Sequence, residues 1–418
     1  VEYSWNIHGK KYNLKAFLDK HPVRKQILEL CVNEPDFTAL FESYHSFCDM
    51  DKIKSIMKKY EIPTDTNTQK SMFNFKHNGF YNTCKREVIK KFCYDIEKSK
   101  SDISWRNTVI SSSLLFCFFQ YLYLFYLTNP FLILLSSFFS GITIVSVGYN
   151  VLHDGSHFAI STRFFINHIS SIIIQPLLLS NHKLWSYHHC IRHHQYTGDY
   201  RLDPDIRNSN PFFRKSDKIK KRSNEFTKSN IEWKLCFFNI FFPGTMLGQS
   251  LLYHIVWTRK KRLWAMNLPK NYFDKWTLFQ YMISFCFCIF EIYYGKLYFL
   301  MHIIGINVGF FIGSAPDHDM YLTHLEISNY DKNMDWGELQ VRNAGNYMNN
   351  YPFFKKFYGG INYQIEHHLF PTLSNHKLKT ISPVVKECCK KFNIPYYTVD
   401  NPIEVFREVV RTYKDIHN

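Results

Sequence analysis

The chain has 418 residues, an aromatic content of 18% and a formal net charge of +16. This length predicts two or three domains, and the charge fits a protein that lies against an anionic membrane surface. No nucleic-acid partner is expected, because the basic residues do not fall on a recognisable reading motif. The 11 Cys residues include no Cys-x-x-Cys spacing, which favours a reduced, cytosol-facing setting over a disulfide framework.

The N-terminal part of the chain is polar, and residues 1–60 predict a small α+β domain. This stretch contains the pair His21-Pro22 and the segment 36–46, which includes a second histidine, His45. Residues 61–106 follow as a connector, which ends in a charged, helix-permissive run.

Two apolar hairpins are predicted in the remainder of the chain. Residues 108–127 and 131–149 form the first, and residues 277–294 and 297–313 form the second. Such stretches suit the roughly 30 Å thickness of a bilayer's hydrocarbon core. No secretory signal is visible at the start, so an internal span is expected to direct membrane insertion. The predicted fold is a mainly α-helical integral membrane protein with about four transmembrane helices.

The segments between the hairpins indicate the orientation of the chain. Residues 164–179 are apolar but contain Asn and His, which favours a helix on the membrane surface, and residues 235–257 also suggest an interfacial segment. The loop 215–261 is strongly basic, and positive loops favour the cytosol. Four spans then return the tail, residues 373–418, to the same side. The tail is helix-permissive, with interruptions expected at Pro383, Pro395 and Pro402.

Three histidine clusters carry the strongest chemical signal. They lie at residues 153–157 (His-Asp-Gly-Ser-His), 189–194 (His-Cys-Ile-Arg-His-His) and 364–368 (Gln-Ile-Glu-His-His). Successive helical side chains point about 100° apart, so adjacent histidines cannot share one face but can supply two neighbouring metal ions. Imidazole suits iron, zinc or copper. Chance clustering of surface histidines is the alternative, and three clusters set among apolar segments argue against it.

These clusters and their setting resemble the membrane fatty acid desaturases. The Gln-x-x-His-His form of the third cluster is similar to the front-end branch, whose members carry an N-terminal cytochrome b5 domain. The resemblance covers nearly the whole chain and implies a desaturase domain at residues 107–418 that binds two non-haem iron ions. The implied metal ligands are His153, His157, His189, His193, His194, His318, Gln364, His367 and His368.

Some assignments near these clusters rest on position alone. His318 follows the fourth span, at the place of an additional ligand in the resembled family. Gln364 stands where other branches have a further histidine, and its amide oxygen is expected to bind weakly or to hold a water. His188, beside the second cluster, is not expected to be a ligand. Carboxylates that could orient imidazoles, with a solvated carboxylate as the alternative for each, are Asp154, Asp203, Asp205, Asp319 and Glu366.

The N-terminal residues resemble the cytochrome b5 domain of front-end desaturases, which implies that His21 and His45 are axial ligands of haem b. Their separation, 45 − 21 = 24 residues, is similar to that of the family. The family's His-Pro pair is normally followed by two glycines, whereas Val23 and Arg24 stand here. These residues restrict the backbone beside a porphyrin, so weaker haem binding is expected. Two surface histidines are the alternative.

The resemblance implies an O2-dependent enzyme that inserts a cis double bond between an existing double bond and the carboxyl end of a long-chain, polyunsaturated acyl group. The substrate would be a membrane lipid or an acyl-CoA. Electrons would come from cytochrome b5 and a separate cytochrome b5 reductase, because no Gly-x-Gly-x-x-Gly motif is present. Free cytochrome b5 would be needed if the N-terminal domain binds no haem.

The implied location is the endoplasmic reticulum membrane, with the histidine clusters and both termini facing the cytosol. Three alternatives remain open at this point: a sphingolipid desaturase, a lipid hydroxylase that uses the same iron site, and an inactive membrane homologue. The sequence leaves the oxidised carbon and the acyl carrier open, since the depth and shape of a substrate tunnel decide both.

Overall fold

The computed structural model describes residues 3–22, 28–32, 34–63, 71–92, 95–207, 209, 212–223, 225–241, 262–263, 266–267, 275–323 and 333–417. Val23 and Arg24 lie outside the described residues, as does most of the segment 235–257 that was expected at the membrane interface.

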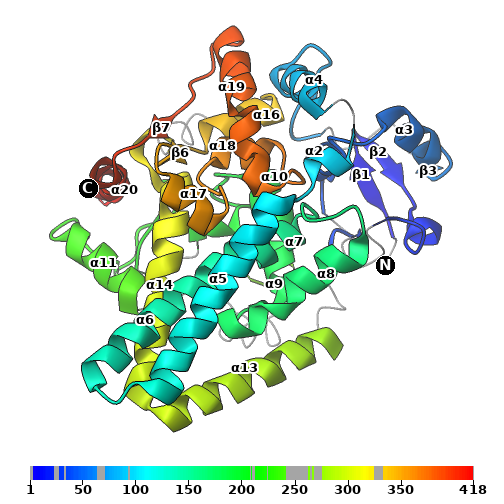
Figure 1. Ribbon diagram of the computed structural model, residues 1–418. Helices are drawn as coiled ribbons and strands as arrows, with labels where there is room; N and C mark the ends of the chain where they lie inside the picture. Colours follow the sequence, from blue (N-terminus) through cyan, green and yellow to red (C-terminus); the bar gives the residue numbers. More distant parts are fainter. Residues whose placement is uncertain are drawn as a thin grey trace.

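The chain begins with a small antiparallel sheet packed against short helices (Figure 1). The strands β1 (Trp5–Ile7), β2 (Lys10–Tyr12) and β3 (Glu61–Ile62) pair in sequence order. The helices α2 (Thr38–Tyr44) and α3 (Met50–Lys58) lie between the second and third strands in the sequence. This α+β unit confirms the fold class predicted for the N-terminus, and its apolar core includes Trp5, Ile7, Tyr12, Leu40 and Phe41.

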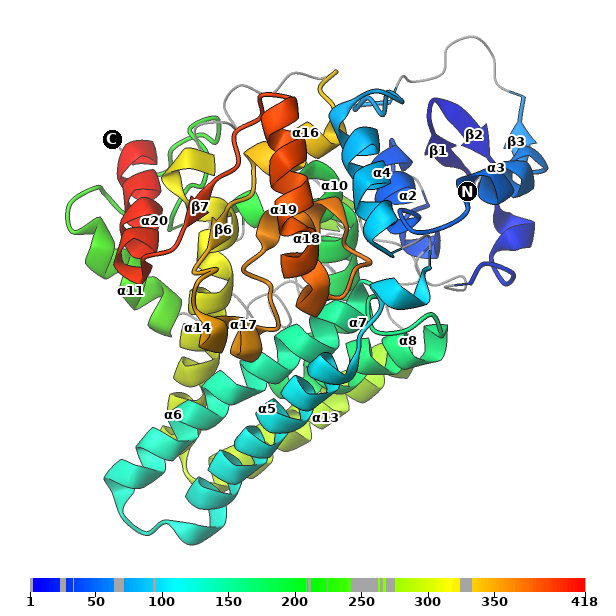
Figure 2. The same cartoon turned by 45° about the horizontal axis from the view of Figure 1, so that its top comes forward.

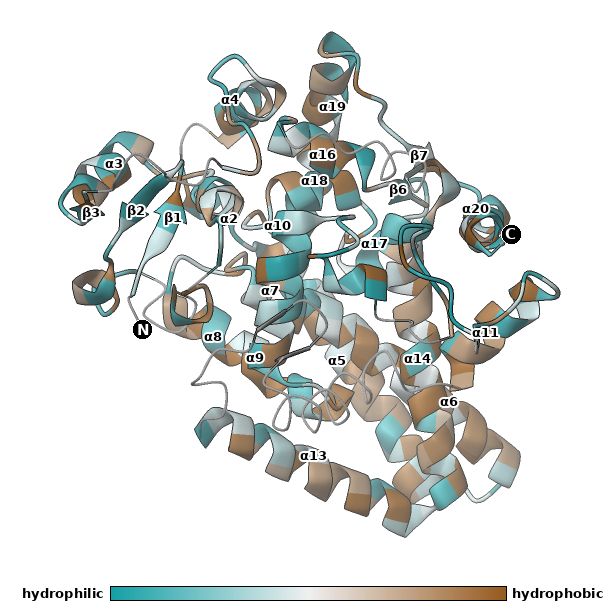
Figure 3. Cartoon of the chain, turned by 180° about the vertical axis from the view of Figure 1, so that it is seen from behind, coloured by the Kyte–Doolittle hydropathy of each residue, from teal (hydrophilic) through white to brown (hydrophobic). Residues whose placement is uncertain are grey.

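Within the described residues, four helices are long and apolar enough to cross a membrane. They contain α5 (Ile103–Tyr121), α6 (Pro130–Val147), α13 (Lys275–Tyr294) and α14 (Lys296–Asp319). The α5–α6 hairpin projects away from the rest of the molecule (Figure 2), and the hydropathy colouring shows hydrophobic surfaces along α13 and α6 (Figure 3). The mainly helical membrane fold with about four spans is thereby confirmed.

The local sequence sets where the first two spanning helices begin. The Asp102 carboxylate accepts hydrogen bonds from the backbone N–H groups of Ser104 and Trp105, at the start of α5. Asn129 caps α6 in the same way, and Pro130 occupies the first turn. A side-chain acceptor satisfies N–H groups that have no partner inside the helix, and proline lacks the N–H that would need one.

Small residues allow α6 and α14 to cross closely. A Cβ atom placed on Gly305 would lie 2.1 Å from a carbonyl oxygen of α6, and one on Gly141 would lie 2.1 Å from a carbonyl oxygen of α14. Gly305, Gly309 and Gly313 recur every four residues, so they lie along one face of α14. Small residues favour such close packing between membrane helices. The crossing fixes α14, which ends beside His318.

A buried carboxylate joins the far ends of α5 and α13. Glu291 accepts a hydrogen bond of 3.0 Å from Gln120 Nε2 and another from the Tyr123 hydroxyl. Tyr123 lies on η3 (Leu122–Tyr126), a π-helical turn that extends α5. A polar group among apolar helices needs such partners, so this contact serves helix packing.

A surface helix and a sharp bend precede the second histidine cluster. In α8 (Phe164–Ile173), Phe165 is 70% exposed on a helix that was predicted at the membrane surface. The helical segments Phe164–Leu178 and His182–Tyr196 are bent by 109° relative to each other. The second cluster therefore runs in a different direction from the apolar segment before it.

The C-terminal region folds over the histidine-bearing side of the spans and is mostly helical (Figure 1). β6 and β7 pair in parallel and connect this region to the last helix. Its elements are α16 (Trp336–Arg342), β6 (Asn346–Tyr347), α17 (Pro352–Tyr358), α18 (Gln364–Leu369), α19 (Asn375–Lys391), β7 (Thr398–Val399) and α20 (Pro402–Ile416).

One expectation for the tail is wrong, because Pro383 lies inside α19 and does not end it. Proline removes one hydrogen bond from a helix interior. Packing outweighs this loss here, since Leu378, Ile381 and Val385 of the same helix are fully buried. Pro402 occupies the first turn of α20, where proline is well tolerated.

Shorter elements connect these parts. They are η1 (Lys15–Phe17), α4 (Phe80–Phe92), η2 (Glu97–Ser99), η4 (Gly148–His153), α7 (Asp154–Ser156), η5 (Gln175–Leu178), α9 (His182–Trp185), η6 (Ser186–His193), α10 (His194–Tyr196), η7 (Pro204–Arg207), α11 (Ile231–Phe241), β4 (Arg262–Leu263) and β5 (Met266–Asn267).

Candidate metal centre

A π-helical turn leads into the first histidine cluster, and a second one contains most of the second cluster. η4 continues α6 and ends at His153, and η6 contains His189 and His193. A π-helical turn closes its hydrogen bonds between residues i and i+5, and such turns are frequent at functional sites. The turns alter the direction in which successive histidines project, which brings clusters from distant parts of the chain together.

One group of nitrogen donors contains histidines from all three clusters. Donor atoms of His153, His157, His189 and His367 lie within 4.8 Å of one another, and all four side chains are buried. The Nε2 atoms of His153 and His189 are 3.0 Å apart. Metal–nitrogen bonds of about 2.1 Å place neighbouring ligands about 3.0–3.4 Å apart in octahedral or tetrahedral geometry. The spacing therefore fits a shared cation.

A second group forms beside the first. It contains His193, His318 and His368, and the Nε2 atoms of His193 and His318 are 3.1 Å apart. Gln364 lies beside this group, with its Nε2 atom 3.1 Å from His318 Nε2, and its amide oxygen is buried without a hydrogen-bond partner among the described residues. The Nε2 atom of His368 is buried and has no hydrogen-bond partner among the described residues. A buried nitrogen without a partner is costly unless a ligand satisfies it.

His194 lies between the two groups. Its Nε2 atom is 3.3 Å from His189 Nε2 and 3.1 Å from His367 Nε2. Its ring also stacks on that of His368, with ring centroids 4.2 Å apart. The structure thus brings all of the ligands implied by the sequence into one cluster, buried except at His318, that suits two neighbouring ions.

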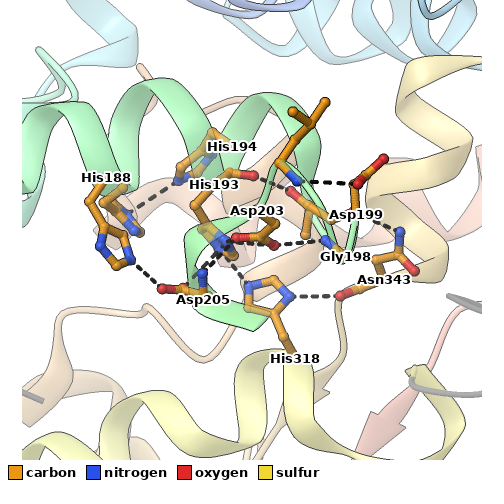
Figure 4. A network of polar contacts seen from close by, with 12 residues as sticks. His188, His193, His194, Gly198, Asp199, Asp203, Asp205, His318 and Asn343 are labelled. Carbon is orange, nitrogen blue, oxygen red and sulfur yellow. Dashed lines mark hydrogen bonds and ion pairs between the residues drawn. The ribbon is translucent and has the colours of Figure 1, made fainter. Parts of the chain in front are cut away.

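Polar partners hold the outer nitrogens of several of these imidazoles (Figure 4). His193 Nδ1 lies 3.1 Å from an oxygen of Asp203, and His318 Nδ1 lies 2.6 Å from the carbonyl oxygen of Asn343. A neutral imidazole that donates through Nδ1 keeps the Nε2 lone pair available for a metal. These contacts therefore select the tautomer that metal binding needs.

Asp205 lies within hydrogen-bond distance of a histidine of the cluster, whereas Asp154 does not. Asp205 lies 3.3 Å from His193 Nδ1 and also pairs with His188 Nε2. This pairing holds His188 beside the cluster through its Nε2 atom. Asp154 Oδ1 is 3.9 Å from His153 Nδ1, beyond hydrogen-bond distance, and Asp154 accepts a hydrogen bond from Ser374 instead.

The remaining two carboxylates considered as imidazole partners pair with other groups. Asp319 lies 2.8 Å from Lys215 Nζ and accepts a hydrogen bond of 3.0 Å from the Tyr413 hydroxyl. Glu366 accepts a hydrogen bond of 2.6 Å from the Tyr396 hydroxyl. Both residues therefore support the segments around the cluster through non-histidine contacts.

Burial controls the protonation of the C-terminal ligands. It holds the pKa values of His367 and His368 well below the ordinary value, and charges on neighbouring histidines act in the same direction. These imidazoles are neutral at pH 7 and can donate a lone pair. Burial also opposes protonation of His193, but the charges of Asp203 and Asp205 raise its pKa to about 9. The same carboxylates increase the basicity of its Nε2 toward a metal.

Sequence reasoning missed three polar partners of the cluster. The Tyr44 hydroxyl lies 2.9 Å from His157 Nδ1, and Gln340 Oε1 lies 2.8 Å from His368 Nδ1. Asn375 Nδ2 lies 3.2 Å from His153 Nδ1. These residues come from α2, α16 and α19, where no histidine motif is present, so only the tertiary fold associates them with the metal centre.

The N-terminal histidines form a separate pair. The ring centroids of His21 and His45 are 6.0 Å apart, and His45 Nδ1 lies 2.8 Å from the Phe41 carbonyl oxygen. Two imidazoles on opposite sides of one metal, with bonds of about 2 Å, place their centroids about 6 Å apart. Burial, with the charge of His45, lowers the pKa of His21 to about 4, so its imidazole is neutral at pH 7. Haem ligation by this pair stays a prediction.

A cavity borders the histidine cluster. Trp185 lines it and stacks on His189, with ring centroids 4.4 Å apart. One part of the wall is apolar, and a second part is polar, at Lys215 and Asp319. The apolar part includes Tyr149, Leu235, Phe238, Phe310 and Phe311. An extended apolar molecule with a polar end matches this division.

Comparisons with known proteins agree with this geometry. A family model described as fatty acid desaturase matches residues 94–400. The chain is 24% identical to an acyl-lipid (8-3)-desaturase of Mortierella alpina, over 96% of this chain and 90% of that protein. It is 26% identical to a chloroplastic acyl-lipid (7-3)-desaturase of Chlamydomonas reinhardtii, over 98% and 79% of the respective chains. It is also 26% identical to Delta(5) fatty acid desaturase A of Dictyostelium discoideum, over 94% and 86%.

Proposed function

This chain belongs to the fatty acid desaturase family, and the relatives that it matches include acyl-lipid desaturases. We therefore propose that it acts as a front-end enzyme. In this proposal it inserts a cis double bond between an existing double bond and the carboxyl end of a long-chain, polyunsaturated acyl group. The relatives named as (8-3)-, (7-3)- and Delta(5) desaturases support this reaction class.

The observation that carries the proposal is the double histidine cluster beside an apolar cavity. Two iron ions held by the clustered imidazoles would supply, with O2, the oxidising power that an unactivated methylene requires. The first group of donors is centred on His153 and His189, and the second on His193 and His318. His194, between the groups, allows the two sites to lie side by side.

The protein's own groups bind and orient the reactants. The apolar wall receives the acyl chain, and Trp185, stacked on His189, limits how closely the chain passes the donors. Lys215, paired with Asp319, lies on the polar part of the cavity. Asp203 keeps His193 oriented through its Nδ1. The burial of the histidines excludes bulk water from the reacting carbon.

The remaining parts of the proposal concern partners and location. We assign residues 1–60 to a cytochrome b5-like domain, residues 61–106 to a connector and residues 107–418 to the desaturase domain. The resemblance of the first segment to a cytochrome b5 domain is the basis for assigning haem b to it, with His21 and His45 as axial ligands and cytochrome b5 reductase as the external electron source. The enzyme would lie in the endoplasmic reticulum membrane, with its histidines and termini facing the cytosol and a membrane lipid or acyl-CoA as substrate.

Expression in yeast supplied with a panel of polyunsaturated fatty acids tests the function directly. Mass spectrometry of the lipids should reveal one new double bond on the carboxyl side of an existing one, and purified enzyme should contain close to two iron ions per chain. A hydroxylated product would show that the enzyme is a lipid hydroxylase instead, and a modified sphingoid chain would show that it is a sphingolipid desaturase.

Two substitutions test the metal assignment. His193→Ala and His368→Ala should each abolish the product and lower the iron content, because neighbouring groups cannot fill the lost coordination position. His77→Ala is the matched control, since His77 is exposed on the connector. Full activity with unchanged iron in either cluster variant would contradict the assignment.

A further inference from the structure

We propose that Tyr44 of the N-terminal domain is a positioning residue of the metal centre, and that its hydroxyl orients His157 for metal binding. The inference rests on the proposed function, because it takes His157 as one of the metal ligands. It adds a group from outside the histidine-bearing segments, so the metal centre would be complete only when the N-terminal domain is docked.

The contact itself is direct. The Tyr44 hydroxyl oxygen lies 2.9 Å from His157 Nδ1 and 3.4 Å from the backbone carbonyl oxygen of Cys190. His157 is completely buried, and its ring centroid lies 4.8 Å from that of His153 and 4.5 Å from that of His194. The hydroxyl therefore contacts the first histidine cluster and the second one, in which Cys190 follows His189.

The chemistry of metal binding fixes the direction of these hydrogen bonds. An imidazole that binds a metal through Nε2 carries its proton on Nδ1. His157 Nδ1–H then donates to the Tyr44 oxygen, and the Tyr44 O–H donates to the Cys190 carbonyl. A hydroxyl can accept one hydrogen bond while it donates another, whereas a Phe ring can do neither. Tyrosine thus fits this position through its oxygen atom.

Buried polar contacts fix the position of Tyr44. The Asp36 carbonyl, just before α2, accepts a hydrogen bond of 2.5 Å from Gln195 Nε2. The Glu34 carboxylate lies 3.2 Å from Arg192 Nε. Buried contacts of this kind require a defined geometry, so they specify how the domain docks on η6. Tyr44 is therefore held against His157 by contacts other than its own.

The sequence position of Tyr44 adds a second connection. Tyr44 is the last residue of α2, and the next residue is His45, one of the paired N-terminal histidines. Adjacent residues at one helix end thus face the two candidate metal-binding sites of the molecule. A displacement of this helix end would alter both sites together.

The test compares two hydroxyl deletions in the full-length protein. Tyr44→Phe removes the oxygen that contacts His157, and Tyr187→Phe removes a hydroxyl at the same domain interface that bonds to Glu34. The measurements are the rate of iron loss to a chelator, the visible spectrum of the Co(II)-substituted protein, and the separate values of kcat and KM. The Co(II) spectrum reports the ligand geometry without requiring turnover.

Tyr44→Phe should lose iron about 10- to 100-fold faster, the range typical for the loss of a partner of a metal-bound histidine. Its Co(II) spectrum should shift, and kcat should fall while KM stays unchanged. Tyr187→Phe should stay within about twofold of the wild type, since it leaves His157 paired. Tyr44→Gln, whose amide can both accept and donate, should retain more iron than Tyr44→Phe.

Three results would overturn the inference. They are wild-type iron retention in Tyr44→Phe, equal iron loss in Tyr44→Phe and Tyr187→Phe, or faster iron loss in Tyr44→Gln than in Tyr44→Phe. Size-exclusion chromatography identifies a variant that has failed to fold, and the Gln variant then decides the question. If the wild type forms no desaturated product, the proposed function fails, while the iron-retention comparison still decides the role of Tyr44.

Discussion

At the scale of single residues, the candidate metal centre depends on the atoms that face away from the metal. His193, His318 and His368 each have Nδ1 within hydrogen-bond distance of a protein oxygen. The oxygens belong to a carboxylate, a backbone carbonyl and a side-chain amide, respectively. Each acceptor holds the Nδ1 atom of its imidazole, so the Nε2 atoms of the three rings are directed together.

The carboxylate partner gives the first prediction. Asp203→Asn should lower iron affinity or kcat about 10- to 100-fold, because the neutral amide supports His193 less well than a charged oxygen. Metal analysis and steady-state kinetics measure the effect. Asp217→Asn is the control and should behave as the wild type, because Asp217 is exposed and lies on the loop that follows Asp203 and Asp205 in the sequence.

A second prediction concerns Glu42, which lies 2.9 Å from His8 and 3.2 Å from Lys85. Burial disfavours its charge, but these partners outweigh burial and lower its pKa to about 2. The unfolded value is about 4.3, so the carboxylate contributes stability above that pH and loses it as the pH falls toward 2. The contribution is about 3 kcal/mol at most.

Thermal unfolding of the full-length protein in detergent measures this effect. Wild type should be more stable than Glu42→Gln at pH 6, and the difference should shrink as the pH is lowered from about 4.5 to 3. Glu387→Gln, an exposed position on α19, is the control and should track the wild type throughout. A difference that grows on acidification would contradict the assigned role of Glu42.

At the scale of helices, the crossing of α6 and α14 gives a third prediction. Gly305→Ala should destabilise the protein strongly, because its Cβ would lie 2.1 Å from the backbone oxygen of Phe138. Gly309→Ala should be much less destabilising, because its Cβ would lie 3.3 Å from the Val145 Cβ, a contact that a shift of a few tenths of an ångström relieves. Fluorescence-detected size exclusion after heating should separate the two variants. Equal stability would mean that the helices can move apart without cost.

Much of the helix content could be predicted from the sequence, and some features could not. The four spans follow from apolar length, and the histidine clusters from residue type and spacing. The π-helical turns at η4 and η6 could not be predicted, because a π-helical turn and an α-helical turn can have the same residue types over such a short stretch. The continuity of α19 through Pro383 depends on packing that a local proline rule does not include.

The polar partners of the histidines show where sequence reasoning ends. Asp203 follows the second cluster closely and could be proposed from sequence, whereas Gln340 and Asn375 contact their histidines only after the chain has folded. Asp319 and Glu366 were equally plausible on proximity in sequence, yet they bind Lys215 and Tyr396. Proximity in sequence therefore did not distinguish between these carboxylates.

At the scale of the whole molecule, the turn between α5 and α6, which includes Asn129, and the C-terminal helix α20 lie at opposite ends of the structure (Figure 2). The proposed orientation places Lys220 and the tail in the cytosol and Asn129 in the lumen, because the basic loop favours the cytosol. A flexible insert with an Asn-x-Thr acceptor should be glycosylated next to Asn129 and remain unmodified next to Lys220 or after α20. Glycosylation of the tail would show that the chain has the opposite orientation.

The docking of the N-terminal domain also affects the order of events during translation. Glu34 is separated from its partner Tyr187 by 153 residues of chain, and Trp5, Leu40 and Phe41 belong to the same apolar cluster as Leu184 and Ile191. At ordinary rates of translation, 153 residues take on the order of 10–30 s to synthesise. The N-terminal domain thus leaves the ribosome before its partner segment around Tyr187 has been synthesised. The surface that will contact this segment stays uncovered while the first hairpin enters the membrane. A nascent chain stalled between these segments would expose that surface to chaperones.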